Sequence, residues 1–170
     1  KLWETYAHLN DTNLPVIFEL AKESPESEAS FEAFTWIVTN GRISIHALRT
    51  FGDQSLEFLR DYHTTNSDIG KVCRHLGNSW DPMNKTAVEF LRIASQKNPN
   101  RNARGYATLA LGQMLKGRAE GVAFFPFSIP STNQWWLQAQ AAYQEEIKKN
   151  GTNAPSAEAQ RAFETVLAQY

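Results

Sequence analysis

The sequence predicts an all-α domain, built from antiparallel helical hairpins stacked as a bundle or an irregular solenoid of about seven to nine helices. Apolar residues recur at intervals of three and four along nearly the whole chain, which is the spacing of one helix face. Helix-starting and helix-ending residues separate these segments by short connections, so consecutive helices are expected to lie antiparallel. Because one helical hairpin cannot bury its apolar face alone, we expect the hairpins to stack.

Length and composition are those of a single globular domain over residues 1–170. Hydrophobic residues make up 42% of the chain and aromatic residues 12%, which argues against disorder. Lys and Arg total 17 against 18 Asp and Glu, so the net charge gives no attraction to nucleic acid. No run approaches the ~18 apolar residues of a membrane span. Helical patterns reach both ends, so we expect a domain taken from a longer chain.

Two short helices are predicted near the start, over residues 2–9 and 12–21, with Pro15 in the first turn of the second. The second helix is expected to bury Val16, Ile17, Leu20 and Ala21. Ser24-Pro25-Glu26 predicts the next helix start, because it combines a capping residue, a first-turn proline and an acid. That helix should end at Asn40-Gly41 and bury Phe31, Phe34, Ile37 and Val38.

Three further helix stripes follow in the middle of the chain. The first is interrupted near Gly52-Asp53 and carries Ile45, Leu48, Phe51, Leu56 and Leu59. The second ends near Gly77-Asn78 and carries Ile69, Val72, Cys73 and Leu76. Asp81-Pro82 predicts the start of the third, which should end before the tight break at residues 98–100 and bury Met83, Ala87, Phe90, Leu91 and Ala94.

The last third of the chain is predicted to hold three helices and one irregular segment. A helix should run from about residue 103 to Gly117, and its small residues should admit a close neighbour: Gly105, Ala107, Ala110 and Gly112. The segment 121–131 contains two prolines and is expected to be an irregular aromatic loop. Ser131 then resembles the start of a capping box. Pro155-Ser156 predicts the start of the final helix.

The sequence offers no catalytic, metal-binding or cofactor-binding set. Cys73 is the only cysteine and lies on an apolar helix face, as expected of a packing residue. The four histidines show no metal-ligand spacing. Asp61 and His63 are close enough to meet at a helix end, but such an offset arises commonly by chance. We therefore predict no enzymatic activity and no cofactor.

An unusual cluster of aromatic residues surrounds the two prolines of the irregular segment. We interpret it in two ways: as a partner-docking anchor, since aromatic residues dominate interface hot spots, or as a plug between helices. The candidate docking residues are Phe124, Phe125, Phe127, Ile129, Trp135 and Trp136. A rival hypothesis is a small-molecule pocket or enzymatic cavity between helices, lined by Trp36, Tyr106, Trp135 and Trp136.

Several segments together suggest a family. The most distinctive are residues 88–92 (VEFLR), 97–101 (KNPNR), 103–107 (ARGYA), 109–111 (LAL) and 115–116 (LK), accompanied by 30–38 (SFEAFTWIV), 56–59 (LEFL) and 162–170 (AFETVLAQY). They resemble the helical region that precedes a thioredoxin-like (redoxin, TlpA-type) domain in planctomycete-type bacterial proteins. The last hairpin is also similar to a tetratricopeptide (TPR) helical repeat, although no fixed period spans the chain.

The resemblance implies an accessory helical domain, in an extracytoplasmic or periplasmic setting, beside a redox module. The implied partner is a protein: a redoxin domain that follows in the same parent chain, or an envelope protein. The redoxin motif WCxxC is absent here, because Trp36 is followed by Ile37 and Cys73 has no second cysteine. No redox role therefore transfers to any residue. We expect a non-enzymatic scaffold for protein–protein or interdomain contacts.

Overall fold

The computed structural model describes residues 2–40, 51–78, 84–124 and 154–170, with seven isolated positions between 137 and 151. These residues form seven α-helices and one short 3-10 helix, and none of them lies in a strand. The prediction of an all-α fold of packed helices is confirmed. The elements are α1 (Leu2–Lys22), α2 (Glu28–Asn40), α4 (Asp53–Tyr62), η2 (Ser67–Ile69), α5 (Gly70–Gly77), α6 (Lys85–Lys97), α7 (Arg101–Phe124) and α9 (Ala154–Gln169).

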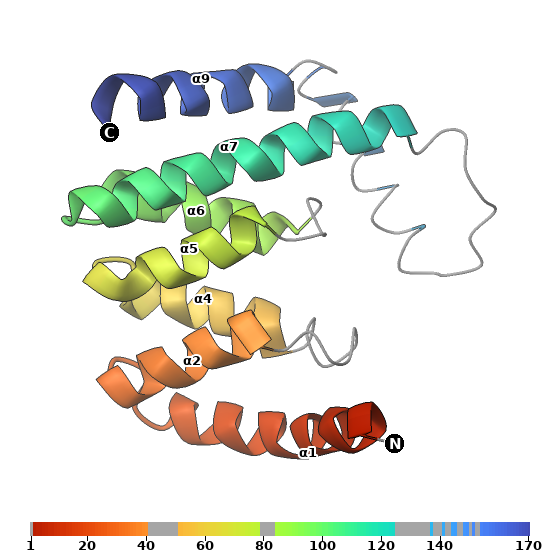
Figure 1. The fold of residues 1–170 in the computed structure, drawn as a ribbon, viewed down its shortest axis with the longest axis vertical. Helices are drawn as coiled ribbons and strands as arrows, with labels where there is room; N and C mark the ends of the chain where they lie inside the picture. The colour runs from red at the N-terminus through yellow and green to blue at the C-terminus, as the bar shows by residue number, and fades with distance from the viewer. Residues whose placement is uncertain are drawn as a thin grey trace.

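The helices follow one another along the long axis, from α1 at one end to α9 at the other (Figure 1). Consecutive helices run in opposite directions, as short connections require (Figure 1). Within this stack, α5 contacts both α2 and α7, and these three helices form the near layer of the view. Behind them α4 packs against α6, and α9 lies along α7. The molecule is thus a two-layered stack in which each helix contacts its neighbours.

The first helix differs from the prediction in extent and in orientation. Residues 2–22 form one continuous helix with Pro15 inside it, where two short helices were predicted. Its buried side chains are Leu14, Phe18 and Ala21, whereas the predicted core residues Val16 and Leu20 are 57% and 61% exposed. Both faces of this helix carry apolar residues, so periodicity does not distinguish them. The large ring of Phe18 decides the orientation because it joins the aromatic core of α2 and α4.

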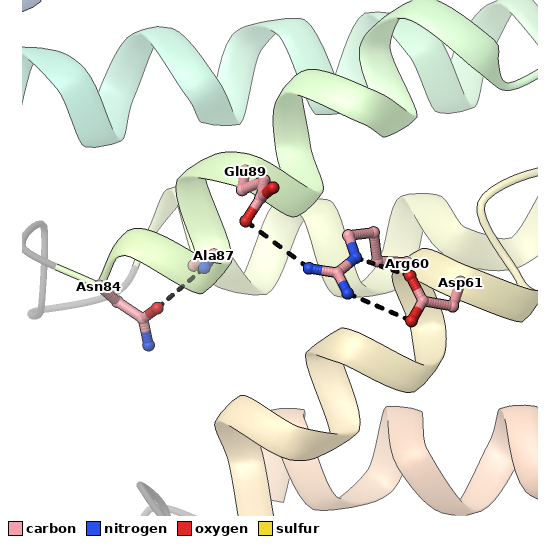
Figure 2. Close-up of polar contacts among 5 residues, drawn as sticks. All are labelled: Arg60, Asp61, Asn84, Ala87 and Glu89. Atoms are coloured by element: carbon pink, nitrogen blue, oxygen red, sulfur yellow. Dashed lines mark hydrogen bonds and ion pairs between the residues drawn. The ribbon is translucent and has the colours of Figure 1, made fainter.

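Several predicted helix ends also need correction. Helix α2 begins at Glu28 rather than at residues 24–26, and the Ser27 hydroxyl accepts a hydrogen bond from the Ser30 N–H. The predicted start at 81–82 lies outside the described residues, and α6 begins at Lys85. Its cap is Asn84, whose side-chain oxygen accepts from the Ala87 N–H at 2.8 Å (Figure 2). Helix α7 continues past Gly117 to Phe124.

One continuous apolar core runs through the stack. In α1, α2 and α4 it is aromatic, and the rings of Phe34 and Phe58 stack with centroids 4.9 Å apart. In α5, α6 and α7 it is mainly aliphatic apart from Phe90, with alanines that let the backbones approach. The predicted faces of α2, α5 and α6 are confirmed by burial of Phe31, Phe34, Ile37, Val38, Ile69, Val72, Cys73, Leu76, Ala87, Phe90, Leu91 and Ala94.

Three turns lie at the same edge of the stack and are joined by buried polar side chains (Figure 1). We call them the turn column: residues 23–27, 63–66 and 98–100. The His63 Nε2–H donates to the Pro25 carbonyl at 2.6 Å. The Asn98 amide donates to the carbonyls of Thr64 and Asn66 at 2.7 and 2.8 Å. Each turn therefore satisfies backbone carbonyls of the turn before it, which fixes the spacing of successive hairpins.

Replacing Asn98 with alanine tests the turn column. Asn98 is buried, and the substitution removes both donated bonds and the acceptor of the Asn100 N–H. Leaving these buried groups unsatisfied should lower the free energy of unfolding by about 2–4 kcal/mol. Urea denaturation monitored by circular dichroism measures this loss. The matched control is Asn102→Ala, at an exposed position on α7, which should change stability by less than about 0.5 kcal/mol.

Candidate interaction surface

The predicted docking anchor falls almost entirely outside the residues that the structure describes. Phe125, Phe127, Ile129, Trp135 and Trp136 all lie there, and Phe124 is the last residue of α7. The choice between anchor and plug therefore stays a prediction.

The structure does not bring together the two described residues of the rival pocket. Trp36 packs from α2 against the core, whereas Tyr106 is exposed on α7. Helix α5 lies between these two helices in the near layer (Figure 1). A cavity shared by Trp36 and Tyr106 is thus not formed.

Cys73 is a core residue. It is fully buried between Val72 and Leu76, in the stripe that the sequence predicts. Burial raises the pKa of its thiol to about 12, because a thiolate would lose its hydration in this apolar surrounding. A protonated and inaccessible thiol is a poor nucleophile.

Asp61 does not meet His63, because each side chain has another partner. The Arg60 guanidinium donates to both carboxylate oxygens of Asp61, at 2.7 and 3.1 Å, and lies 3.6 Å from Glu89 on α6 (Figure 2). The hydrogen bond from Arg60 lowers the pKa of the Asp61 carboxyl. His63 instead bonds to Pro25. Both pairs serve the packing of α4 against its neighbours.

Within the described part of the chain, no three His, Cys, Asp or Glu side chains are grouped as metal ligands would be. None of the described helices has the length and apolar character needed to cross a bilayer.

Helix α9 packs closely on α7, because two aromatic rings at α9 cover two glycines of α7. We call these two contacts, Phe163 on Gly112 and Tyr170 on Gly105, the glycine seats. A Cβ atom built on Gly112 would lie 2.9 Å from the Phe163 ring, and one built on Gly105 would lie 2.9 Å from the Tyr170 ring. Each pair is seven residues apart along its helix, which is about two turns. Of the small residues predicted to admit a close neighbour, Gly105 and Gly112 are therefore confirmed in that role. The two seats fix the antiparallel register of α7 and α9.

This register places two exposed leucines side by side. Leu109 lies midway between the glycine seats on α7, and Leu167 lies midway between the aromatic residues on α9. Leu167 follows Glu158 by nine residues (167 − 158), or about two and a half turns, so it lies on the opposite side of α9. Glu158 reaches back to Arg92 on α6, with two contacts of 2.7 Å. Leu167 therefore faces the side of α7 that borders α5.

These leucines and two tyrosines form what we call the tyrosine–leucine patch: Tyr106, Leu109, Leu167 and Tyr170. All four are among the exposed large hydrophobic residues of the described chain, and Leu167 is 87% exposed. Single exposed apolar side chains are normal, but four on two adjacent helices make this surface the candidate for a contact site. No pattern within a single helix predicts this patch, because its halves are separated by more than fifty residues. The spacing Gly-x6-Gly against Phe-x6-Tyr is the signal that would have located it.

Two arginines border the tyrosine–leucine patch, each against one of its tyrosines. The guanidinium carbon of Arg74 lies 4.7 Å from the centroid of the Tyr106 ring. That of Arg101 lies 5.7 Å from the centroid of the Tyr170 ring, and Arg101 also donates to the Gln169 carbonyl. Neither guanidinium is paired with a carboxylate among the described residues. Their charges are thus available at the rim of the patch.

Lys71, the other cation exposed on α5, differs from these arginines. It lies 3.0 Å from Asp68 and 3.7 Å from Glu32. The hydrogen bond with Asp68 raises the pKa of the Lys71 ammonium group. Its charge is compensated within the molecule.

Comparison with known proteins gives no relative: no family model, no curated protein sequence and no solved structure matches this chain.

The buried thiol should make stability depend on alkaline pH. The folded state raises the pKa of the Cys73 thiol from 9.0 to about 12. The contribution of the protonated thiol to the free energy of unfolding is therefore fully present below pH 9 and is lost as the pH rises from 9 towards 12. Over that range the free energy of unfolding of the wild type should fall by up to about 1.4 kcal/mol per pH unit more than that of Cys73→Ala. Urea denaturation of both proteins at several pH values measures the difference. Equal pH dependence, or rapid labelling of the native thiol by Ellman's reagent, would contradict this assignment.

The α7–α9 seat is tested by Gly112→Ala. Alanine favours a helix over glycine by about 1 kcal/mol, so the substitution would stabilise a helix with open space beside it. The contact with Phe163 predicts the opposite sign, a loss of about 1–3 kcal/mol. In a Phe163→Leu background the loss should shrink or reverse, which a double-mutant cycle of urea denaturation measures. A stabilising effect in the wild-type background would exclude the seat.

Proposed function

We propose that this chain is a non-catalytic helical scaffold that mediates protein–protein or interdomain contacts through the tyrosine–leucine patch. The observation that carries the proposal is the exposed apolar cluster on α7 and α9, held in register by the two glycine seats. Aromatic and arginine residues are the side chains most enriched at binding hot spots, and the patch with its rim contains both.

The resemblance to helical regions that precede redoxin domains supports a particular setting. In that setting the partner is the redoxin domain of the parent protein or an envelope protein, in an extracytoplasmic compartment. A scaffold needs a rigid surface rather than reactive groups. The turn column and the continuous core supply rigidity, since buried hydrogen bonds connect successive hairpins.

A small-molecule site draws less support from the described residues. Its proposed aromatic lining is divided between the core, where Trp36 packs, and the surface, where Tyr106 lies. A pocket also requires a few converging polar groups. Two of the buried polar side chains, His63 and Asn98, serve the turns instead.

Site-specific photo-crosslinking tests the proposed function. A benzoylphenylalanine placed at residue 167 of the parent protein, in the cell that expresses it, should give a discrete crosslinked product. The same label at residue 96, which is exposed on α6, should not. Leu109→Ser should reduce the product at residue 167 by about three-fold or more, since burying one leucine contributes about 1.5–3 kcal/mol.

Circular dichroism of the Leu109→Ser variant checks that the helices remain folded. Equal crosslinking from both labelled positions, or a product unaffected by Leu109→Ser, would contradict the use of this patch.

A further inference from the structure

We propose that the tyrosine–leucine patch recognises an acidic amphipathic helix, one that presents aliphatic side chains flanked by carboxylates. This inference rests on the proposed function and adds to it the chemical class of the partner. The chemistry of the bordering arginines decides the class, because they lie at the two tyrosine positions of the patch.

The geometry favours a partner helix that presents aliphatic side chains, such as leucine, to the patch. Both tyrosines lie at the Gly105 end of the patch, since Tyr106 follows Gly105 and the Tyr170 ring covers Gly105. Leu109 and Leu167 come next, towards Gly112 and Phe163. An apolar helix face bears side chains three and four residues apart, which suits two leucines followed by two rings. Burial of these four side chains would supply the apolar part of the binding energy.

The charges of Arg74 and Arg101 favour a partner helix with carboxylates next to its aliphatic side chains. Arg74 and Arg101 each lie against a tyrosine ring and have no carboxylate partner among the described residues. A guanidinium held against a ring keeps its edge N–H groups available, and these match a carboxylate in a two-bond geometry. Lys71, by contrast, already contacts Asp68 and Glu32. Glu164, three residues before Leu167 on α9, accepts a hydrogen bond from the Gln160 amide. The surface thus offers the positive charge of two arginines at the tyrosine end of the patch.

The same charges argue against a second copy of this chain as the occupant. A two-fold dimer that paired the tyrosine end of the patch with itself would bring the arginines of one copy near those of the other. Like charges placed together across an interface oppose binding. A partner with acidic flanks replaces this repulsion by attraction.

Defined helical peptides test the proposal. One peptide carries two leucines at positions i and i+4 flanked by glutamates, and a matched peptide has glutamine in place of every glutamate. Fluorescence anisotropy with the folded chain should show about ten-fold tighter binding of the glutamate peptide. Arg74→Gln and Arg101→Gln should each weaken it by about three-fold, as expected for exposed ion pairs, and salt should remove the difference.

Two control variants separate charge from structure. Lys71→Gln removes a positive charge from α5 but should leave binding of the glutamate peptide unchanged, because Lys71 is already paired. Arg101→Lys keeps a positive charge next to Tyr170 but loses the two-bond geometry, so it should weaken binding less than Arg101→Gln does. Circular dichroism confirms that each variant is folded.

Five results would overturn the proposal, and they differ in what they leave of the proposed function. Equal binding of both peptides, or none of either while crosslinking from residue 167 persists, would refute the acidic partner and leave the contact surface. Absence of peptide binding together with loss of crosslinking from residue 167 would refute both the acidic partner and the proposed contact surface. Binding to phosphatidylglycerol vesicles that Arg74→Gln abolishes, without peptide binding, would assign the surface to a membrane. A dimer in sedimentation equilibrium that Leu167→Ser dissociates would assign it to a second copy.

Discussion

The close approach of α9 to α7 is the constraint on which the surface of this protein depends. Two glycines on α7 accept two aromatic rings from α9 at distances that exclude a Cβ atom. Because both pairs are two turns apart, they fix the axial register as well as the separation of the helices. That register sets Leu167 at the level of Leu109 and brings the Arg101–Tyr170 pair to the end of α7 where Arg74 lies against Tyr106. A shift of one turn would disperse the patch.

The rest of the stack provides a rigid base for this surface. Buried side chains of the turn column bind backbone carbonyls of neighbouring turns, so each hairpin is positioned by the next. Ionic contacts such as those of Arg60 lie across α4 and α6 (Figure 2). Asp61 and His63, which suggest chemistry in the sequence, therefore have structural partners. Cys73 is inert for another reason, since burial keeps its thiol protonated.

Sequence reasoning succeeded where one face of a helix is clearly more apolar than the other. It located the buried faces of α2, α5 and α6 and the break at Asn98. It failed at α1, whose two apolar faces are distinguished only by the fit of Phe18 into the aromatic core. Contacts such as His63 with Pro25 join residues far apart in the chain, so no local pattern reports them. The tyrosine–leucine patch was missed for the same reason.

Nuclear Overhauser effects between α7 and α9 test the central claim most directly. The account predicts strong effects from the Phe163 ring to the Hα atoms of Gly112 and from the Tyr170 ring to those of Gly105, because each ring covers its glycine. Ring currents should also shift these Hα resonances upfield. Absence of both effects, or effects from the same rings to residues one turn away on α7, would contradict the register and with it the surface built on it.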